Sequence, residues 1–244
     1  MSSKTHPNPP ASSILEELQA LGDEKTKAML MRNHGVREPC FGVKIGDMKP
    51  IVKRIKKDHA LALALYDTGN YDAQYFAGLI ADDAAMSKAD LNRWMKNAIG
   101  GSLSGFTVPW VTAGNPKGWE IASEWIDSGS EQAAECGWGA LGSLVAVRQD
   151  EDLDLQELER LLKRVEDEIP TAPDLVRYAM NGFLISVGCY VASLSPLAIE
   201  IGERLGKITA NLGPNACKIP YAPDYIRKVE KRGAIGKKRK TVKC

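Results

Sequence analysis

Residues 131–168 read EQAAECGWGALGSLVAVRQDEDLDLQELERLLKRVEDE, and this stretch gives the clearest indication of the fold class. Apolar residues recur at helical spacing over 131–147 and again over 155–168. The polar run RQDEDLD between them interrupts both patterns. The stretch therefore predicts two helices joined by a short connection, and each helix has an apolar side that must be buried against a neighbour.

The same arrangement extends over most of the chain. Further helices are predicted at 14–21, 60–66, 72–83, 88–99, 117–127, 174–191 and 196–205, separated by breakers such as Thr68-Gly69-Asn70. No alternating run of β-branched residues predicts a strand. Helix pairs that recur every 35 to 45 residues or so predict an all-α, HEAT-like superhelix of stacked antiparallel pairs. A compact irregular helical bundle is the competing architecture.

The predicted domain organisation has three parts. Residues 1–13 are polar and Pro-rich and are expected to form a flexible N-terminal arm. Residues 14–228 are expected to form a single helical repeat domain, with an extended segment at 208–224. A short helix is predicted at 225–230, where the domain meets the tail. Residues 229–244 form a basic C-terminal tail, and its last part, 233–244, is expected to be flexible.

The net charge of +1 conceals a marked asymmetry. Residues 227–244 contain nine Lys or Arg and one Glu, a net charge of +8, so the other 226 residues carry −7. Basic tails of this kind bind nucleic acid or another polyanion, and they also occur as solubilising ends or localisation signals. With no apolar run long enough to span a bilayer, we expect a cytoplasmic monomer without membrane partners, associated with the nucleoid if the source is bacterial.

A second basic cluster is predicted on the helix that follows the irregular stretch 33–46. Asp47 is expected to cap this helix, with Pro50 in its first turn and Met48, Ile51 and Ile55 on its apolar side. Its opposite side is expected to carry four lysines at the spacing of one helical face: Lys49, Lys53, Lys56 and Lys57. Either this face is simply solvated, or it faces phosphates.

Several chemistries are not indicated by the sequence. The five cysteines are widely spaced, and no pair has the CxxC spacing of a structural zinc site, so we expect reduced, mostly buried thiols. No phosphate-binding loop or dinucleotide fingerprint is present, and Gly139 and Gly142 are interpreted as close helix-packing positions. We therefore expect no metal and no cofactor.

Two groups of residues have both a structural and a functional interpretation. Trp110 lies in the breaker-rich stretch GFTVPWVTAGNPKGW, which predicts a loop. There it anchors the repeats by burial or stacks on a nucleobase or sugar. Glu120, Glu124 and Asp127 share one predicted helical face, and they form either a solvated acidic surface or a source of a general base.

Three stretches together resemble the DNA alkylation-repair family, AlkD-like branch. They are HGVREPCFGVKIGDMKPIVKRIKK at 34–57, VPWVTAGNPKGWEIASEWID at 108–127, and VRYAMNGFLISVGCYV at 176–191 followed by ACKIPYAPDYI and the ending GKKRKTVKC. The resemblance runs from about Ile14 to the end. It implies a HEAT-like superhelix whose concave face holds duplex DNA, and its active members are metal-free glycosylases that excise cationic alkylated purines.

The chain departs from the family pattern at the position that matters for catalysis. The resemblance implies a tryptophan with an aspartate four residues later, and that aspartate stabilises the positive charge that develops on the sugar. Here the residue four places after Trp110 is Gly114. The late helix of active members carries a tryptophan, whereas the matching stretch here, 179–184, has only Phe183. The sequence thus indicates a divergent branch without the catalytic aspartate.

We therefore expect a DNA alkylation-repair-like protein that binds duplex DNA on a basic concave surface. The alternatives are an alkylpurine glycosylase that uses another carboxylate, and a non-catalytic scaffold for DNA or a protein partner. No catalytic residue is assigned. The predicted DNA-binding residues are Lys44, Lys49, Lys53, Lys56, Lys57, Trp110, Arg148, Arg177, Lys237, Lys238, Arg239 and Lys240.

Overall fold

A computed structural model describes residues 8–98, 100–213 and 218–243, and all regular structure within them is helical. The helices are α1 (Ala11–Ala20), α2 (Glu24–His34), α3 (Ile45–Ile55), α4 (His59–Tyr66), α5 (Tyr71–Ile80), η1 (Asp83–Ala85), α6 (Lys88–Asn97), η2 (Leu103–Thr107), α7 (Val108–Ala113), α8 (Gly118–Ile126), α9 (Glu131–Val147), η3 (Asp150–Asp152), α10 (Leu155–Glu168), α11 (Asp174–Tyr190), η4 (Ala192–Leu194), α12 (Ser195–Leu205) and α13 (Ala222–Lys231).

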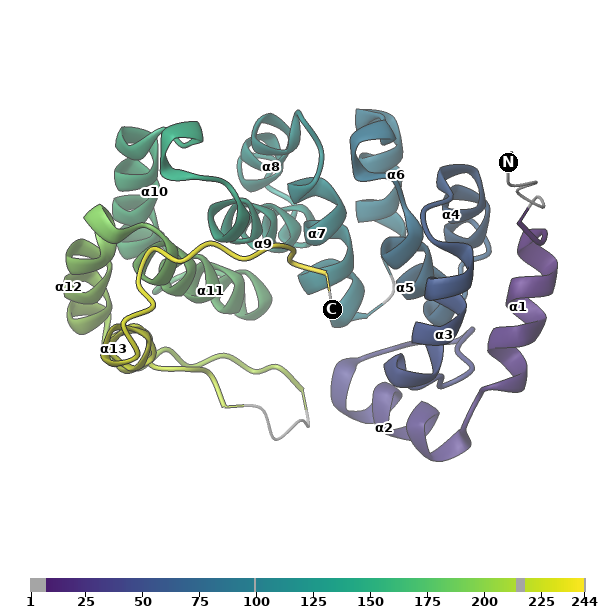
Figure 1. The fold of residues 1–244 in the computed structure, drawn as a ribbon. Coiled ribbons are helices and arrows are strands. Elements are labelled where there is room, and N and C mark those ends of the chain that lie inside the picture. Colours follow the sequence, from purple (N-terminus) through teal and green to yellow (C-terminus); the bar gives the residue numbers. More distant parts are fainter. Residues whose placement is uncertain (1–7, 99, 214–217, 244) are drawn as a thin grey trace.

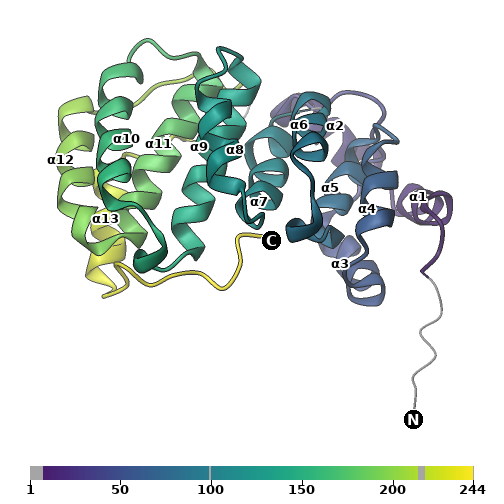
Figure 2. The same cartoon turned by 90° about the horizontal axis from the view of Figure 1, so that it is seen from above.

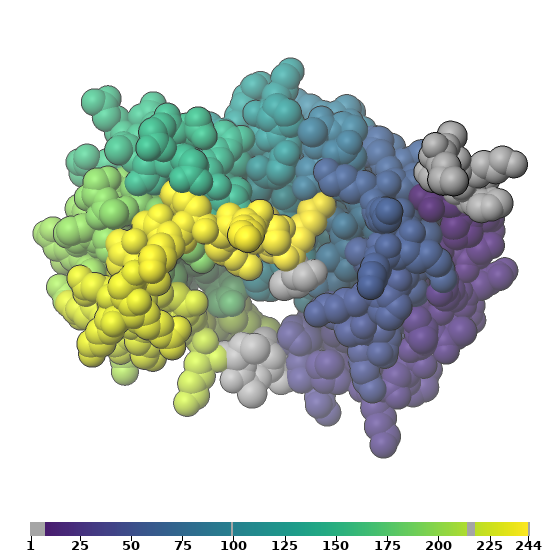
Figure 3. Space-filling view, viewed as in Figure 1, coloured from purple at the N-terminus to yellow at the C-terminus, as the bar shows by residue number. Residues whose placement is uncertain are grey.

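The helices form two rows that curve into an arc. In Figure 1, α10, α8, α6 and α4 lie along the top, and α11, α9, α7 and α5 lie below and between them. Within the lower row α9 packs against both α7 and α11, and it also contacts α8 of the upper row. The space-filling view shows a hollow at the lower centre of the arc, between the C-terminal and N-terminal arms (Figure 3). The prediction of an all-α superhelix of stacked pairs is confirmed.

Short polar side chains cap six of the thirteen α-helices in the described residues: α2, α4, α5, α6, α9 and α10. Asp58 accepts a hydrogen bond from the Leu61 amide at the start of α4, and Asp154 accepts one from the Glu157 amide at the start of α10. Ser87 and Asp90 form a reciprocal capping box on α6. Because caps and apolar spacing are both local signals, the predicted bounds of α9 and α10 agree with the structure.

The two rows share one continuous apolar core. Its largest side chains include Trp94, which stacks on Tyr66 with ring centroids 4.0 Å apart, and Trp138, which packs against Phe183. A Cβ added to Gly139 would lie 3.0 Å from the Pro109 ring on α7, so this glycine permits close packing as predicted. Cys40, Cys136 and Cys189 are free and buried. Cys217 and Cys244 lie outside the described residues.

No single described helix is long and apolar enough to cross a membrane. α11 and the residues from Ala192 to Leu205 meet that test only together, and the pair is bent by 114°.

The start of α3 differs from the prediction. The helix begins at Ile45, with Lys44 as its N-cap residue, so Asp47 lies within the first turn and Pro50 lies inside the helix. The preceding segment is held in place by the buried Asp72 carboxylate, which accepts hydrogen bonds from the amides of residues 41, 42 and 43. This anchor lies on α5, about thirty residues away, where no local signal reveals it.

The stretch around Trp110 is helical rather than a loop. η2 is a π-helical turn, in which the Val108 amide donates to the Leu103 carbonyl five residues earlier, and it runs directly into α7. Pro109 is accommodated because it occupies the first turn of α7, where its missing N–H is not needed. The breaker residues therefore start and end this helix instead of preventing it.

The ends of the chain also differ from the prediction. α1 begins at Ala11, inside the predicted arm, and the Asn8 side chain donates a hydrogen bond to Asp58. Residues 1–7 lie outside the described residues. At the other end α13 starts at Ala222 and extends to Lys231. Residues 233–243, which the sequence predicts to be flexible, run along the surface of the helical body (Figure 1).

Candidate nucleic-acid interface

The α3 region carries the first group of exposed cations. Met48, Ile51 and Ile55 bury the apolar side of α3, which leaves Lys49 and Lys53 exposed on the other side. The prediction of one helical face with four lysines is wrong, because α3 ends at Ile55 and Lys56 adopts a φ of 62°. Lys44, Lys56 and Lys57 remain exposed beside the helix, and Lys57 lies 3.4 Å from Asp82.

Residues 233–243 form the second basic group, and we call them the strap. Three of the strap's basic side chains are exposed: Lys237, Arg239 and Lys240. The other two are turned toward the protein. Lys238, whose side chain is only 7% exposed, lies 2.7 Å from Asp150, and Lys243 lies 2.6 Å from Asp83.

The strap is ordered because it satisfies the ends of the lower-row helices. The last carbonyls of a helix have no partner within it and carry partial negative charge. The strap supplies donors to these carbonyls: the Gly236 amide bonds to the Cys189 carbonyl of α11, and the Arg239 amide bonds to the Ala146 carbonyl of α9. The Lys238 and Lys243 ammonium groups donate to the carbonyls of Val145 and Ala81.

The two basic groups lie on the same side of the molecule. The strap and α3 both lie toward the viewer in Figure 1, and both lie along the lower edge when the molecule is seen from above in Figure 2. The space-filling view shows the strap crossing the middle of this side (Figure 3). We call the exposed cations of the α3 region and of the strap together the basic face, and they are Lys44, Lys49, Lys53, Lys56, Lys237, Arg239 and Lys240.

Three other predicted DNA-binding residues have partners within the protein. Arg177 donates to the carbonyls of Ile169 and Ala172 at the end of α10 and to that of Thr209. Arg148 reaches the Asn115 carbonyl at 3.5 Å. Together with Lys238, these side chains stabilise connections between helices, and we do not place them in the proposed interface.

Trp110 lies at the centre of an aromatic cluster. It is 8% exposed and meets Tyr75 of α5 edge-to-face, with the ring centroids 6.1 Å apart. Phe106 lies at the same centroid distance from Trp110 and is 45% exposed. The burial of Trp110 agrees with the first of its two interpretations, in which it anchors the repeats. Phe106, which the sequence pattern did not single out, is the exposed aromatic residue of this segment.

The position of the missing catalytic aspartate is filled by another carboxylate. A Cβ built on Gly114 would lie 2.6 Å from the Cβ of Asp83 and closer still to its Oδ2. Asp83 belongs to η1 and is held there by Lys243 of the strap. Burial raises the pKa of Asp83, and the Lys243 charge partly opposes this effect. No sequence signal connects residues 83, 114 and 243.

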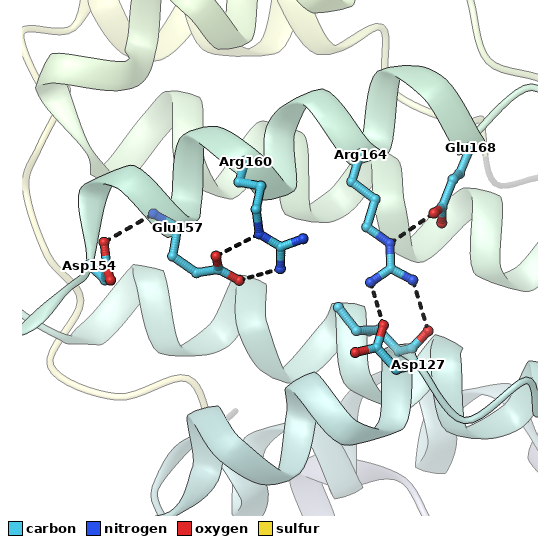
Figure 4. A network of polar contacts seen from close by, with 7 residues as sticks. Asp127, Asp154, Glu157, Arg160, Arg164 and Glu168 are labelled. Atoms are coloured by element: carbon cyan, nitrogen blue, oxygen red, sulfur yellow. Dashed lines mark hydrogen bonds and ion pairs between the residues drawn. The ribbon is translucent and has the colours of Figure 1, made fainter.

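The carboxylates predicted as an alternative source of a general base belong to the upper row. Glu124 of α8 pairs with Lys88 of α6, and Asp127 pairs with Arg164 of α10. Figure 4 shows Arg164 shared between Asp127 and Glu168, beside the Arg160–Glu157 pair. Glu120 is exposed on the same helix. These residues link neighbouring outer helices, which agrees with the structural interpretation.

One buried carboxyl group does lie near the aromatic cluster. Glu135 of α9 is 4% exposed, and its side chain lies beside Gly105 of η2. Burial raises its pKa to about 7, although a hydrogen bond with Ser104 opposes the rise. Among the described residues, no group of three or more His, Cys, Asp or Glu side chains is placed to hold a metal ion.

The fold is that of a HEAT-like repeat protein. The chain belongs to the DNA alkylation repair enzyme family, whose pattern matches residues 14–201. It is 32% identical to an uncharacterized protein of Listeria monocytogenes and 31% identical to one of Listeria innocua, each over 88% of this chain and 95% of the relative.

A solved structure is also similar along nearly the whole chain. It represents a new family of proteins related to the HEAT-like repeat DNA glycosylases with affinity for branched DNA structures. The TM-score is 0.89 and the identity 37%, covering 97% of this chain and 100% of the other. The resemblance to the AlkD-like branch that the sequence motifs indicate is thus confirmed.

Proposed function

We propose that this protein binds the phosphate backbones of DNA through the basic face, with a preference for branched over linear duplexes, and that it does not excise bases. The observation that carries the proposal is the placement of two separate groups of exposed cations, beside α3 and on the strap, on one side of the arc. Phosphate contacts of this kind provide affinity and orientation without reading sequence.

The separation of the two groups favours a branched ligand. α3 lies near the N-terminal end of the arc, and the strap begins at its C-terminal end beside α13 (Figure 1). A branch point sends duplex arms in different directions, so one arm reaches α3 while another lies along the strap. The similar protein with affinity for branched DNA supports this choice of ligand.

A glycosylase function is not favoured. The carboxylate that fills the space beside Gly114 is partly buried against the strap and paired with Lys243, so it is not free to stabilise a developing positive charge. A scaffold for a basic peptide is also not favoured. The cavity between α12, α13 and the strap is lined by three glutamates, Glu200, Glu203 and Glu230, but two of them already pair with Arg204 and Arg227.

The test is a salt titration of DNA binding with the double variant Lys49→Gln plus Lys53→Gln. Fluorescence anisotropy is measured with a three-way junction and with a linear duplex of equal length. The wild type is expected to bind the junction more tightly. The variant should bind more weakly, and the slope of log K against log salt should fall by roughly 0.9 for each phosphate that the variant leaves unneutralised.

The matched control is Lys96→Gln plus Lys163→Gln, which removes two charges from α6 and α10 in the upper row. This control should retain most of the affinity and the slope. The proposal fails if both variants lose affinity equally, or if the wild type binds neither DNA. Incubation with methylated duplex DNA, compared with a heat-inactivated sample, should release no 3- or 7-methylpurine.

A further inference from the structure

One exposed aromatic ring covers two buried ones at the middle of the arc. Phe106 is the solvent-facing member of a series in which Trp110 contacts both Phe106 and Tyr75. Trp110 and Tyr75 are 8% and 5% exposed, whereas Phe106 is 45% exposed. An exposed ring that packs on a buried ring, which is itself fixed by a third, loses little conformational freedom when a flat ligand stacks on it.

The π-helical turn exposes this ring. Phe106 and Trp110 are four residues apart, a spacing that places two side chains on one face of a regular α-helix. Here the bond from the Val108 amide to the Leu103 carbonyl widens the turn that contains Phe106. The wider turn changes the direction of Phe106 relative to Trp110, so that one is exposed while the other is buried. Such turns are uncommon in helices and frequently occur at functional sites.

The surroundings of this ring suit nucleic acid. η2 packs against α5 and α9, α3 also contacts α5, and the strap binds the end of α9, so the segment that carries Phe106 lies along the arc between α3 and the strap. The segment from His34 to Val36 lies against Gly100 and Gly101, just before η2. The next residue, Arg37, is exposed. Proteins use exposed aromatic rings, together with nearby basic surface, to hold unpaired bases.

We propose that Phe106 stacks on an unpaired or unstacked nucleobase at the branch point of the DNA, while the basic face holds the arms. This inference rests on the proposed function, because it assigns the contact at the centre of the same ligand. A branch point is the place where bases lose a stacking neighbour, so an aromatic ring placed there replaces that neighbour. This stacking contact gives the protein a way to distinguish a junction from a linear duplex that does not depend on charge.

The test compares Phe106→Ala with Phe106→Tyr, which keeps an aromatic ring. Phe106→Ala should weaken binding to a junction with unpaired bases at its centre by about ten-fold and leave binding to linear duplex within about two-fold. Phe106→Tyr should retain the wild-type preference. Tyr225→Ala is the matched control, because Tyr225 on α13 is 47% exposed and lies outside the cluster.

A fluorescent base provides a direct readout of stacking. 2-Aminopurine at the junction centre should be quenched by wild-type protein and by Phe106→Tyr, and not by Phe106→Ala, whereas 2-aminopurine in an arm should respond equally to all three. If wild type and Phe106→Ala quench and bind alike, the stacking role is overturned and DNA binding by the basic face survives. If the wild type binds no DNA at all, the proposed function itself is overturned.

Discussion

Gly114 shows how a residue without a side chain leaves space for a carboxylate from another part of the chain. Its α-carbon faces the Asp83 side chain so closely that any Cβ there would contact three atoms of Asp83 at less than 3 Å. The aspartate of the active relatives therefore cannot be restored by one substitution, because the space is already occupied by a carboxylate that pairs with Lys243.

We expect Gly114→Asp to destabilise the protein by about 2 kcal/mol or more, through steric overlap and repulsion between two carboxylates. The double variant Asp83→Gly plus Gly114→Asp should recover most of this loss, since the new carboxylate then takes the place beside Lys243. Urea denaturation of the wild type, both single variants and the double variant measures the coupling. Additive effects would contradict the proposed exchange of carboxylates.

Glu135 should make the stability of the protein depend on pH. Its pKa is about 7 in the folded protein and near 4.5 when unfolded, so between these values the unfolded chain loses the proton that the folded chain keeps. Stability due to this group is therefore greatest below about pH 4.5 and falls as pH rises toward 7, by up to roughly 3 kcal/mol. Glu135→Gln should remove this fall.

The measurement is the urea midpoint of the wild type and of Glu135→Gln at pH 5 and pH 8. Glu135→Gln keeps a polar group of the same size beside Ser104, so packing is preserved. The difference between the two proteins should be larger at pH 8, with the variant more stable there. A difference that is the same at both pH values would show that Glu135 is ionised in the folded protein.

Among the structural elements, the strap has a role that its amino-acid composition does not suggest. Its lysines suggest a mobile cationic tail, yet Lys238 and Lys243 bind helix ends and carboxylates, while Lys237 and Lys240 stay exposed. Lys238 and Lys243 thus face the protein, whereas Lys237, Arg239 and Lys240 face outward. The strap is thus a structural element that also contributes cations to the basic face.

We expect Lys243→Ala to destabilise the protein by about 1–3 kcal/mol, because it leaves the partly buried Asp83 without its cation. Lys237→Ala, a nearby substitution of the same kind on the exposed side, should change stability by less than about 0.5 kcal/mol. Urea denaturation at neutral pH measures both. Equal stabilities for the two variants would mean that the strap is not bound to the body in solution.

α3 and η2 show what local signals cannot supply. The sequence predicts α3 and its lysines from the apolar spacing, but its first turn depends on a segment that Asp72 organises from α5. The helical state of the segment around Trp110 depends on its packing against α5 and α9. Gly and Pro in that segment indicate only where a helix can begin or end, so the sequence alone favours a loop.

Across the whole molecule, curvature brings together sites that are remote in the sequence. Asp83 and Lys243 are 160 residues apart, and Lys238 and the Val145 carbonyl are 93 apart. The arc places the ends of α5, α9 and α11 along one edge, where a single extended segment reaches all of them. DNA binding as we propose it depends on this edge, because the edge holds the strap on the same side of the molecule as α3.

Local sequence was enough to predict most of the helices, their pairing into a superhelix, the family, the lysines beside α3 and the absence of an aspartate four residues after Trp110. These features depend on local periodicity, on capping and on the identity of single residues. The packed fold was needed to show that the tail is a bound strap, that Asp83 occupies the space beside Gly114 and that Phe106 rather than Trp110 is exposed. Each of these depends on the packing of distant segments, which satisfies helix ends and buried charges that no local pattern records.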